Sequence, residues 1–315
     1  MELQLKNIGM IKEANVKIDG LTLIAGENDT GKSTVGKGLY SIIKFYKTIF
    51  KKRRDNLWND YEHIFNEVYK SDFNHINLKI DSFEMKYGEF IWELPKQYQL
   101  LDVIFIESPL VWNFTDFFRD IAQVESQMNI KLDYPYLMKD LNFKLHIKSA
   151  SSGLDIKDEM IDLMGGEFKK DDLGRYYFDK QGMKIDLVNT ATGIKYFGIF
   201  QILSQNKYLN ENTVLILDEP EVHLHPKWQL EMAKVIVELV KNGVKIVVNS
   251  HSPYMIEALE LYAKKYEINS HFYLSEKVDD MAEIRDVSDN LEPIYKKLAM
   301  AIDSLEKISL ENFKW

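Results

Sequence analysis

The sequence predicts an α/β fold with an N-terminal antiparallel β portion and a mainly helical insertion, and three observations support this. The first twenty residues alternate apolar and charged side chains, as paired strands with one covered face do. A glycine-rich loop, GENDTGKST (Gly26–Thr34), lies between an apolar strand and a helix. Further along, the apolar segments 214–217 and 244–248 flank an amphipathic helix, which is the pattern of a βαβ unit.

The elements before residue 51 follow from residue spacing. ELQLKNI and EANVKI are expected to pair as two strands, and Leu21–Ala25 is a third, apolar strand. After the glycine loop, apolar residues recur three and four positions apart up to Phe50, which is the helical period. The glycine loop is therefore expected at a strand-to-helix junction.

The middle of the chain, about residues 51–180, predicts an insertion of helices and hairpins. Its expected elements are a helix at Asp55–Lys70, a hairpin at 76–86, a strand at Val103–Ile106, helices from Phe114 onward, and a hairpin turning at Gln181-Gly182. The later chain predicts helices at Ile194–Leu203 and Lys227–Val240, two strands within 271–287, and a helix at Glu292–Ile308. We therefore expect one discontinuous domain, with its core at about 1–50, 100–110 and 185–285, and a C-terminal strand and helix at 286–315.

Composition excludes several kinds of site. The 315 residues include no cysteine, which excludes disulfides, thiolate metal sites and cysteine nucleophiles. The net charge of −9 argues against non-specific coating of nucleic acid. The N-terminus lacks the apolar core of a signal peptide, and no apolar run is long enough for a membrane span. A cytoplasmic protein without membrane contact is therefore expected.

Gly26-x-x-x-x-Gly31-Lys32-Ser33 matches the P-loop pattern in full. In such a loop the backbone N–H groups surround phosphate oxygens, the lysine reaches the terminal phosphates and the serine binds Mg²⁺. Asn28 and Asp29 are the non-glycine types that best tolerate a left-handed backbone. The alternative, a glycine-flanked turn without function, is disfavoured by the flanking strand and helix. The predicted nucleotide contacts are Gly26, Asn28, Asp29, Thr30, Gly31, Lys32, Ser33 and Thr34.

Two later strands end in residues that suit phosphoryl chemistry. In VLILDEPE the strand Val214–Leu217 leads into Asp218, expected to hold Mg²⁺, and Glu219, expected to polarise an attacking water. In VKIVVNSHSP the strand ends at His251, where a side chain can contact the terminal phosphate. An acidic turn and an ordinary loop histidine are the alternatives. Lys32, Glu219 and His251 are the predicted catalytic residues.

Together, GENDTGKS, LILDEPEVHLHP and NSHSP resemble the heads of ABC-type ATPases, in the branch that includes RecF, the SMC proteins and the OLD family. The resemblance covers about residues 1–50 and 185–285. It implies ATP hydrolysis with Mg²⁺ by a homodimer, in which a signature loop of one subunit caps the nucleotide held by the other.

The candidate signature loop, NTATGIKYFG, departs from the family pattern LSGGQ. Ala191 stands where the family has serine, so Thr190 or Thr192 would supply the hydroxyl, and Gly193 completes the motif. The family's Q-loop glutamine is also missing, since the strand VIFIESP ends in Glu107-Ser108. These departures put the turnover rate in question and leave nucleotide binding expected.

The resemblance leads to a hypothesis of an ATP-gated switch for a separate effector, a nuclease or toxin, in anti-phage defence. Nuclease activity of this chain itself is not expected, because the Asp-x-Asp pair of the OLD nuclease domain is missing. One alternative is a RecF-like repair ATPase that contacts nucleic acid through Lys51, Lys52, Arg53 and Arg54. That basic run is more simply a set of cations at a helix C-terminus. A second alternative is a nucleotide-sensing module with little turnover.

Overall fold

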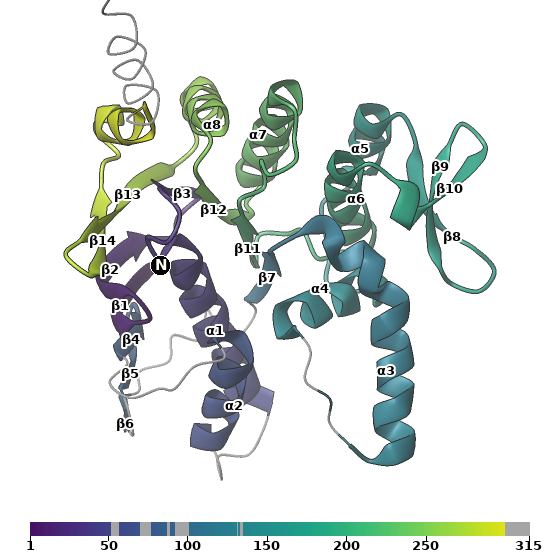
Figure 1. Cartoon of the computed structure of the whole chain (residues 1–315), viewed down its shortest axis with the longest axis horizontal. Coiled ribbons are helices and arrows are strands. Elements are labelled where there is room, and N and C mark those ends of the chain that lie inside the picture. Colours follow the sequence, from purple (N-terminus) through teal and green to yellow (C-terminus); the bar gives the residue numbers. More distant parts are fainter. Residues whose placement is uncertain are drawn as a thin grey trace, which may run out of the picture.

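The computed structural model describes residues 1–51, 57–69, 77–86, 89–91, 101–130, 132 and 135–299. Within these ranges eleven strands form one curled sheet, in the order β6-β5-β4-β1-β2-β14-β13-β3-β12-β11-β7 (Figure 1). Its strands are β1 (Glu2–Ile8), β2 (Ile11–Lys17), β3 (Leu21–Gly26), β4 (Asn77–Ile80), β5 (Phe83–Lys86), β6 (Glu89–Ile91), β7 (Asp102–Ile106), β11 (Thr213–Asp218), β12 (Lys245–Ser250), β13 (Ser270–Val278) and β14 (Met281–Asp286). A second sheet contains β8 (Glu167–Lys170), β9 (Tyr176–Lys180) and β10 (Met183–Asp186).

Helices cover both faces of the main sheet (Figure 1). The α-helices are α1 (Lys32–Lys51), α2 (Leu57–Tyr69), α3 (Thr115–Met128), α4 (Tyr136–His146), α5 (Lys157–Met164), α6 (Thr192–Gln205), α7 (Pro226–Lys241) and α8 (Pro253–Lys265), with short 3-10 helices at η2 (Pro109–Phe114) and η3 (Leu187–Asn189). Residues 292–299 are also helical. The predicted α/β fold class is confirmed.

The sheet combines a parallel and an antiparallel part, as the sequence predicts. β13, β3, β12, β11 and β7 are successive parallel neighbours. β1 pairs antiparallel with both β2 and β4, and β5 and β6 continue that antiparallel part. The expected strand at 103–106 therefore becomes β7, at the edge of the parallel part.

Alternation along the central strands divides the core into two layers. On β11, Leu215 and Leu217 face one apolar cluster, which also contains residues of α6, α7 and α8. Val214 and Ile216 face the other cluster, which contains residues of α1. Because both faces of these strands are covered, they are apolar throughout rather than alternating with polar residues. This burial explains why the strands are easy to identify in the sequence.

The predicted insertion divides between two places in the fold. Its first strands, β4 to β6, extend the main sheet through the pairing of β1 with β4. The later part, with α3, α5 and the second sheet, lies at the opposite end of the molecule, beyond β7 (Figure 1). The proposed division of the chain into core segments and one insertion stays a prediction. Lys52, Arg53 and Arg54, and the expected helix beyond residue 299, lie outside the described residues.

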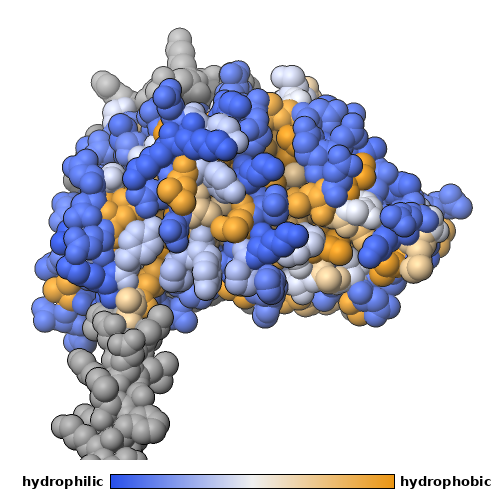
Figure 2. All heavy atoms as spheres, turned by 90° about the horizontal axis from the view of Figure 1, so that it is seen from above, coloured by the Kyte–Doolittle hydropathy of each residue, from blue (hydrophilic) through white to orange (hydrophobic). Residues whose placement is uncertain are grey.

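The surface above α7 and α8 is mostly hydrophilic, with hydrophobic residues in patches between hydrophilic ones (Figure 2). In the part of the chain that the structure describes, no helix combines the length and the apolarity needed to cross a membrane.

Candidate functional site

The candidate site forms where three neighbouring parallel strands end. β12 lies between β3 and β11, and the register sets Ser250 opposite Ala25 and Asn249 opposite Asp218. Because the three strands run in the same direction, their carboxyl ends meet at one edge of the sheet. The structure therefore brings together the glycine loop after β3, the acidic pair after β11 and the histidine after β12.

The glycine loop has the backbone that its sequence predicts. Asp29 has a φ of 59° and Gly31 a φ of 86°, both in the left-handed region. Gly26 has a φ of 156°, and a Cβ added there would lie 2.3 Å from the carbonyl oxygen of Ser275. The Ser275 hydroxyl in turn donates to the Thr30 carbonyl at 2.6 Å. Strand β13 therefore supports the loop from outside, a contact that sequence reasoning missed.

Lys32 begins α1 and is almost fully buried, with 4% of its surface exposed. Its Nζ donates to the carbonyl oxygens of Gly26 at 2.9 Å and Glu27 at 2.6 Å, and lies 3.9 Å from Glu219 Oε1. Burial lowers the pKa of Lys32, and the carboxylates of Glu219 and Asp218 oppose that shift. The ammonium group thus lies inside the loop, where phosphate oxygens would replace its carbonyl partners.

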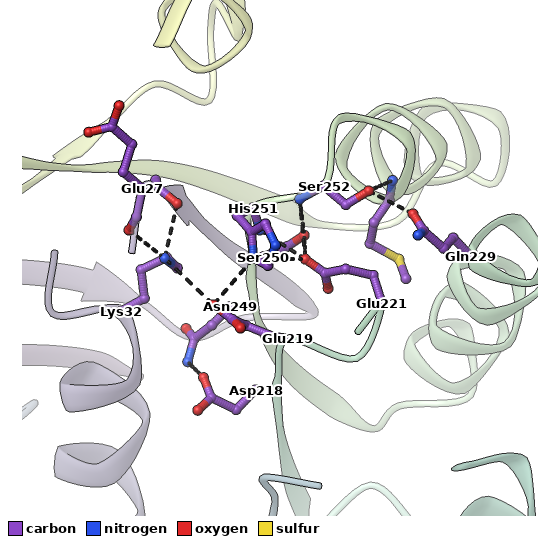
Figure 3. Close-up of polar contacts among 12 residues, drawn as sticks. Glu27, Lys32, Asp218, Glu219, Glu221, Gln229, Asn249, Ser250, His251 and Ser252 are labelled. Atoms are coloured by element: carbon purple, nitrogen blue, oxygen red, sulfur yellow. Dashed lines mark hydrogen bonds and ion pairs between the residues drawn. The ribbon is translucent and has the colours of Figure 1, made fainter. Parts of the chain in front are cut away.

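Ser33 and Asp218, the two predicted Mg²⁺ ligands, lie within hydrogen-bond distance of each other. Asp218 Oδ1 accepts a hydrogen bond from Ser33 Oγ at 3.0 Å. It accepts a second one from Asn249 Nδ2 at 2.8 Å (Figure 3). Burial raises the pKa of Asp218, and these two hydrogen bonds oppose the shift.

A hydroxyl and a carboxylate are the hard oxygen donors that Mg²⁺ prefers, so the pair fits this ion. Among the described residues, no three His, Asp or Glu side chains are arranged to hold a metal. The predicted Mg²⁺ would therefore take further oxygen ligands from nucleotide phosphates.

Glu219 and His251 face each other across the strand ends. Glu219 has a left-handed φ of 48°, and its backbone N–H donates to the Asn249 carbonyl at 2.9 Å. Its Oε1 lies 3.3 Å from His251 Nδ1. The side chains are 32% and 40% exposed, so both remain accessible to a ligand at the loop.

A buried carboxylate, Glu221, holds the loop that contains His251. Its Oε1 accepts hydrogen bonds from Ser250 Oγ at 2.6 Å, His251 N at 2.9 Å and Ser252 N at 3.2 Å (Figure 3). The Ser252 hydroxyl donates to Gln229 Oε1 at 2.6 Å, which extends the network to α7. Glu221 was not among the predicted site residues. The pattern DEPE, in which a second glutamate follows the acidic pair, was the signal that could have identified it.

The candidate signature residues lie at the start of α6. Thr192 is the first residue of the helix, and the preceding Ala191 provides no side-chain cap. Thr190 Oγ1 instead donates to the Asp186 carbonyl at 3.0 Å, and a Cβ on Gly193 would lie 3.0 Å from a methyl group of Leu224. Among the described residues, no hydrogen bond or ion pair links this segment to the glycine loop of the same chain. Its role toward a second subunit stays a prediction.

Thr34 and Asn28 take less part in the described contacts. Tyr69 Oη donates to the Thr34 carbonyl at 2.8 Å, so α2 contacts the end of the glycine loop. Asn28 is exposed at the tip of the loop. Lys277, from β13, lies 3.6 Å from Asp29 and is also exposed at that tip. These residues leave the outer side of the loop open.

Comparison with known proteins bears on the family and the fold of the chain. The AAA ATPase domain family matches residues 47–256, which include Asp218, Glu219 and His251 and begin after the glycine loop. No curated protein matches the chain.

Among solved structures, an SMC head bound to the C-terminal winged-helix domain of ScpA is 12% identical, covering 94% of this chain and 98% of that one, with a TM-score of 0.53. An SMC head domain from Thermotoga maritima is 14% identical, covering 91% of this chain and 98% of that one, with a TM-score of 0.47. The ATP-binding cassette of an ABC transporter is 13% identical, covering 93% and 94%, with a TM-score of 0.41. The first of these supports the likeness in fold.

Proposed function

Because the chain belongs to the AAA ATPase domain family and is an ABC/SMC-like P-loop ATPase head, we propose that ATP is hydrolysed where β3, β11 and β12 end. The single observation that best supports this location is the contact between Ser33 Oγ and Asp218 Oδ1 at 3.0 Å. This contact joins residues 185 positions apart in the sequence, one from the phosphate loop and one from the acidic pair. Phosphoryl transfer requires these two segments to lie side by side.

The roles of the binding residues follow from their positions. Backbone N–H groups of the glycine loop and the N-terminus of α1 would bind the phosphates, and Lys32 would contact the terminal ones. Ser33 and Asp218 would hold Mg²⁺, which when bound neutralises charge on the phosphate oxygens. Asn249 orients Asp218 by donating to its Oδ1. The choice of ATP over other nucleotides follows from membership of the AAA ATPase domain family.

The hydrolytic step would use Glu219 and His251. Water attacks the terminal phosphorus, its oxygen forms the new P–O bond, and the bond to the bridging oxygen breaks. Glu219 would accept the proton that the water loses. His251, 3.3 Å from Glu219, would contact the transferred phosphoryl group and register its departure.

We further propose that ATP drives formation of a homodimer, with Thr190, Thr192 and Gly193 of one subunit capping the nucleotide of the other. The free N–H groups at the start of α6 support this role, since they can face an anion. The dimer would switch a separate effector, a nuclease or toxin, in anti-phage defence. That last step rests on association with the resembling families and on no contact in this chain.

The solution mass of Glu219→Gln, measured by light scattering with and without Mg-ATP, tests the switch. Removal of the water-polarising carboxylate is expected to trap a dimer before hydrolysis, so the mass doubles only with nucleotide. The double variant Lys32→Ala, Glu219→Gln is the control, because it loses the phosphate contact and should stay monomeric. An unchanged mass in Glu219→Gln, with nucleotide shown to be bound, would contradict the proposed dimer.

A further inference from the structure

A groove lies between α5 and α7, and none of the described residues that line it belongs to the predicted nucleotide site. Its volume is about 490 Å³, which is within the range of sites that bind ligands or the side chains of a partner. Both helices pack on the apolar cluster that lies opposite α1 (Figure 1). Its floor is apolar, with Ile156, Met160 and Leu163 on the α5 side and Val235 and Leu239 on the α7 side.

The apolar floor has the spacing of two helix faces. Ile156, Met160 and Leu163 are four and three positions apart, so their side chains lie on one face of α5. Val235 and Leu239 are four positions apart and share a face of α7 in the same way. Seven positions of helix span about 10 Å, or two turns. An amphipathic helix docks in a groove of this length with apolar side chains at positions i, i+3 or i+4, and i+7.

The rim of the groove is acidic on both sides. Glu159 and Asp162 line it from α5, and Glu231 and Glu238 line it from α7. Lys234 is the single cation among the described residues that line the groove. Carboxylates therefore lie along both edges of the apolar floor.

Three of these carboxylates have no cation beside them. In the part of the chain that the structure describes, Glu159, Asp162 and Glu231 make no ion pair and no side-chain hydrogen bond. Glu238 differs, since its Oε2 lies 3.8 Å from Lys241 Nζ. Uncompensated charges of one sign around a groove attract a partner of opposite charge and disfavour acidic ones. The complementary occupant therefore carries an apolar stripe flanked by lysine or arginine.

The groove also connects helices that border the proposed ATPase site. The start of α5 is bonded to α6 through Ser204, whose Oγ accepts from Ile156 N at 3.1 Å and donates to the Leu154 carbonyl at 2.8 Å. On α7, Gln229 Oε1 accepts a hydrogen bond from the Ser252 hydroxyl at 2.6 Å. An occupant of the groove would thus touch both the helix bonded to α6 and the helix that joins the Glu221 network.

We propose that this groove is a docking site for a basic amphipathic helix of a partner protein. Its apolar side chains would cover the floor, and its lysines or arginines would pair with Glu159, Asp162 and Glu231. The same groove of a second copy is a poor occupant, because two acidic rims would face each other. This inference goes beyond the proposed ATPase activity and does not depend on it.

A labelled peptide tests the groove in the absence of nucleotide. The probe is a fluorescein-labelled synthetic helix with leucines at positions i, i+4, i+7 and i+11 and lysines on both sides of that stripe, and fluorescence anisotropy measures its Kd. We expect the triple variant Glu159→Gln, Asp162→Asn, Glu231→Gln to weaken binding about tenfold, because three ion pairs are lost. Amides of nearly the same shape replace the carboxylates, so the fold should be unchanged.

A second triple variant controls for net charge. Glu257→Gln, Asp280→Asn, Asp289→Asn removes the same charge from exposed positions that do not line the groove, and its Kd should stay within twofold of wild type. A peptide of the same composition, with its leucines scattered over all faces of the helix, should bind wild type at least tenfold more weakly.

Three results would overturn the inference. No saturable binding of the striped peptide below about 1 mM would do so. Equal binding of the two peptides, or equal Kd values for the two triple variants, would show that the probe is attracted by net charge alone. Wild-type protein that dimerises without nucleotide, and loses peptide binding as it does so, would assign the groove to a second copy. ATP hydrolysis enters none of these measurements, so a failure of the proposed function is detected separately.

Discussion

Replacement of Glu221 by glutamine is expected to weaken both the fold and the site, because this side chain joins the ends of two strands. The carboxylate is 3% exposed, and its Oε1 accepts hydrogen bonds from Ser250 Oγ, His251 N and Ser252 N at 2.6, 2.9 and 3.2 Å. A hydrogen bond to a charged group contributes about 1.5–3 kcal/mol. Glutamine keeps an accepting oxygen but loses the charge, and neutral hydrogen bonds are roughly half as strong. Three bonds weakened by about half give an expected destabilisation of about 2–4 kcal/mol.

The same change should affect turnover through His251. Because Glu221 binds the backbone N–H of His251, its replacement loosens the histidine without touching the glycine loop. We therefore expect a lower kcat for ATP with little change in nucleotide affinity. Urea unfolding followed by tryptophan fluorescence measures the stability, and a coupled ATPase assay below the unfolding transition measures kcat.

Glu257→Gln provides the control for the loss of one negative charge. Glu257 is exposed on α8, and such surface changes usually alter stability by less than about 0.5 kcal/mol. If Glu221→Gln also stays within about 0.5 kcal/mol of wild type, the three hydrogen bonds do not stabilise the strand ends as argued.

Two further predictions concern buried charge and the glycine loop. Lys144 is 3% exposed, and its Nζ lies 3.1 Å from Asp140 Oδ2. Lys144→Met should lower the free energy of unfolding in urea by about 3 kcal/mol, because it removes a cation that pairs with the buried carboxylate of Asp140. Burial and the charge of Lys144 lower the pKa of Lys44 to about 8, below its unfolded value, so the unfolded chain binds more protons above pH 8. Wild type should therefore gain about 2 kcal/mol relative to Lys44→Met between pH 8 and 10, and no gain would refute this assignment. Gly26→Ala should abolish ATP binding measured by calorimetry, because the added Cβ would lie 2.3 Å from the Ser275 carbonyl oxygen. Gly174→Ala is the control and should leave ATP binding unchanged, because a Cβ there has no neighbour within 4 Å.

The parts of the site that the sequence predicts are those encoded over short distances. The glycine loop needs a strand before it and a helix after it, and these lie within one segment of the chain. Asp218 ends one apolar strand that is buried on both faces, and His251 directly follows another, so their position at a strand end follows from the apolar runs.

The parts that the sequence did not predict depend on distant partners. Glu221 bonds to residues 29 to 31 positions away, so its hydrogen-bond partners cannot be identified from its own segment. Ser275 supports the glycine loop across 245 residues of chain. The strand Glu89–Ile91 is three residues long, too short for a periodic pattern to predict it, and it exists as an edge through its pairing with β5.

The strand order explains how a loop and a carboxylate on separate strands come into contact. β12 lies between β3 and β11, so Asp218 is two strand spacings, about 9.6 Å, from the strand that leads into the loop. Helix α1 closes that distance by crossing over the strands, with Gly36 against Ile216 and Phe105, where an added Cβ would lie 2.9 and 3.0 Å from their side chains. This close packing brings the first turn of α1 near the end of β11, so Ser33 Oγ lies 3.0 Å from Asp218 Oδ1. The intervening strand is left free to end at His251, between the phosphate loop and the acidic pair, which is where its proposed contact with the terminal phosphate requires it.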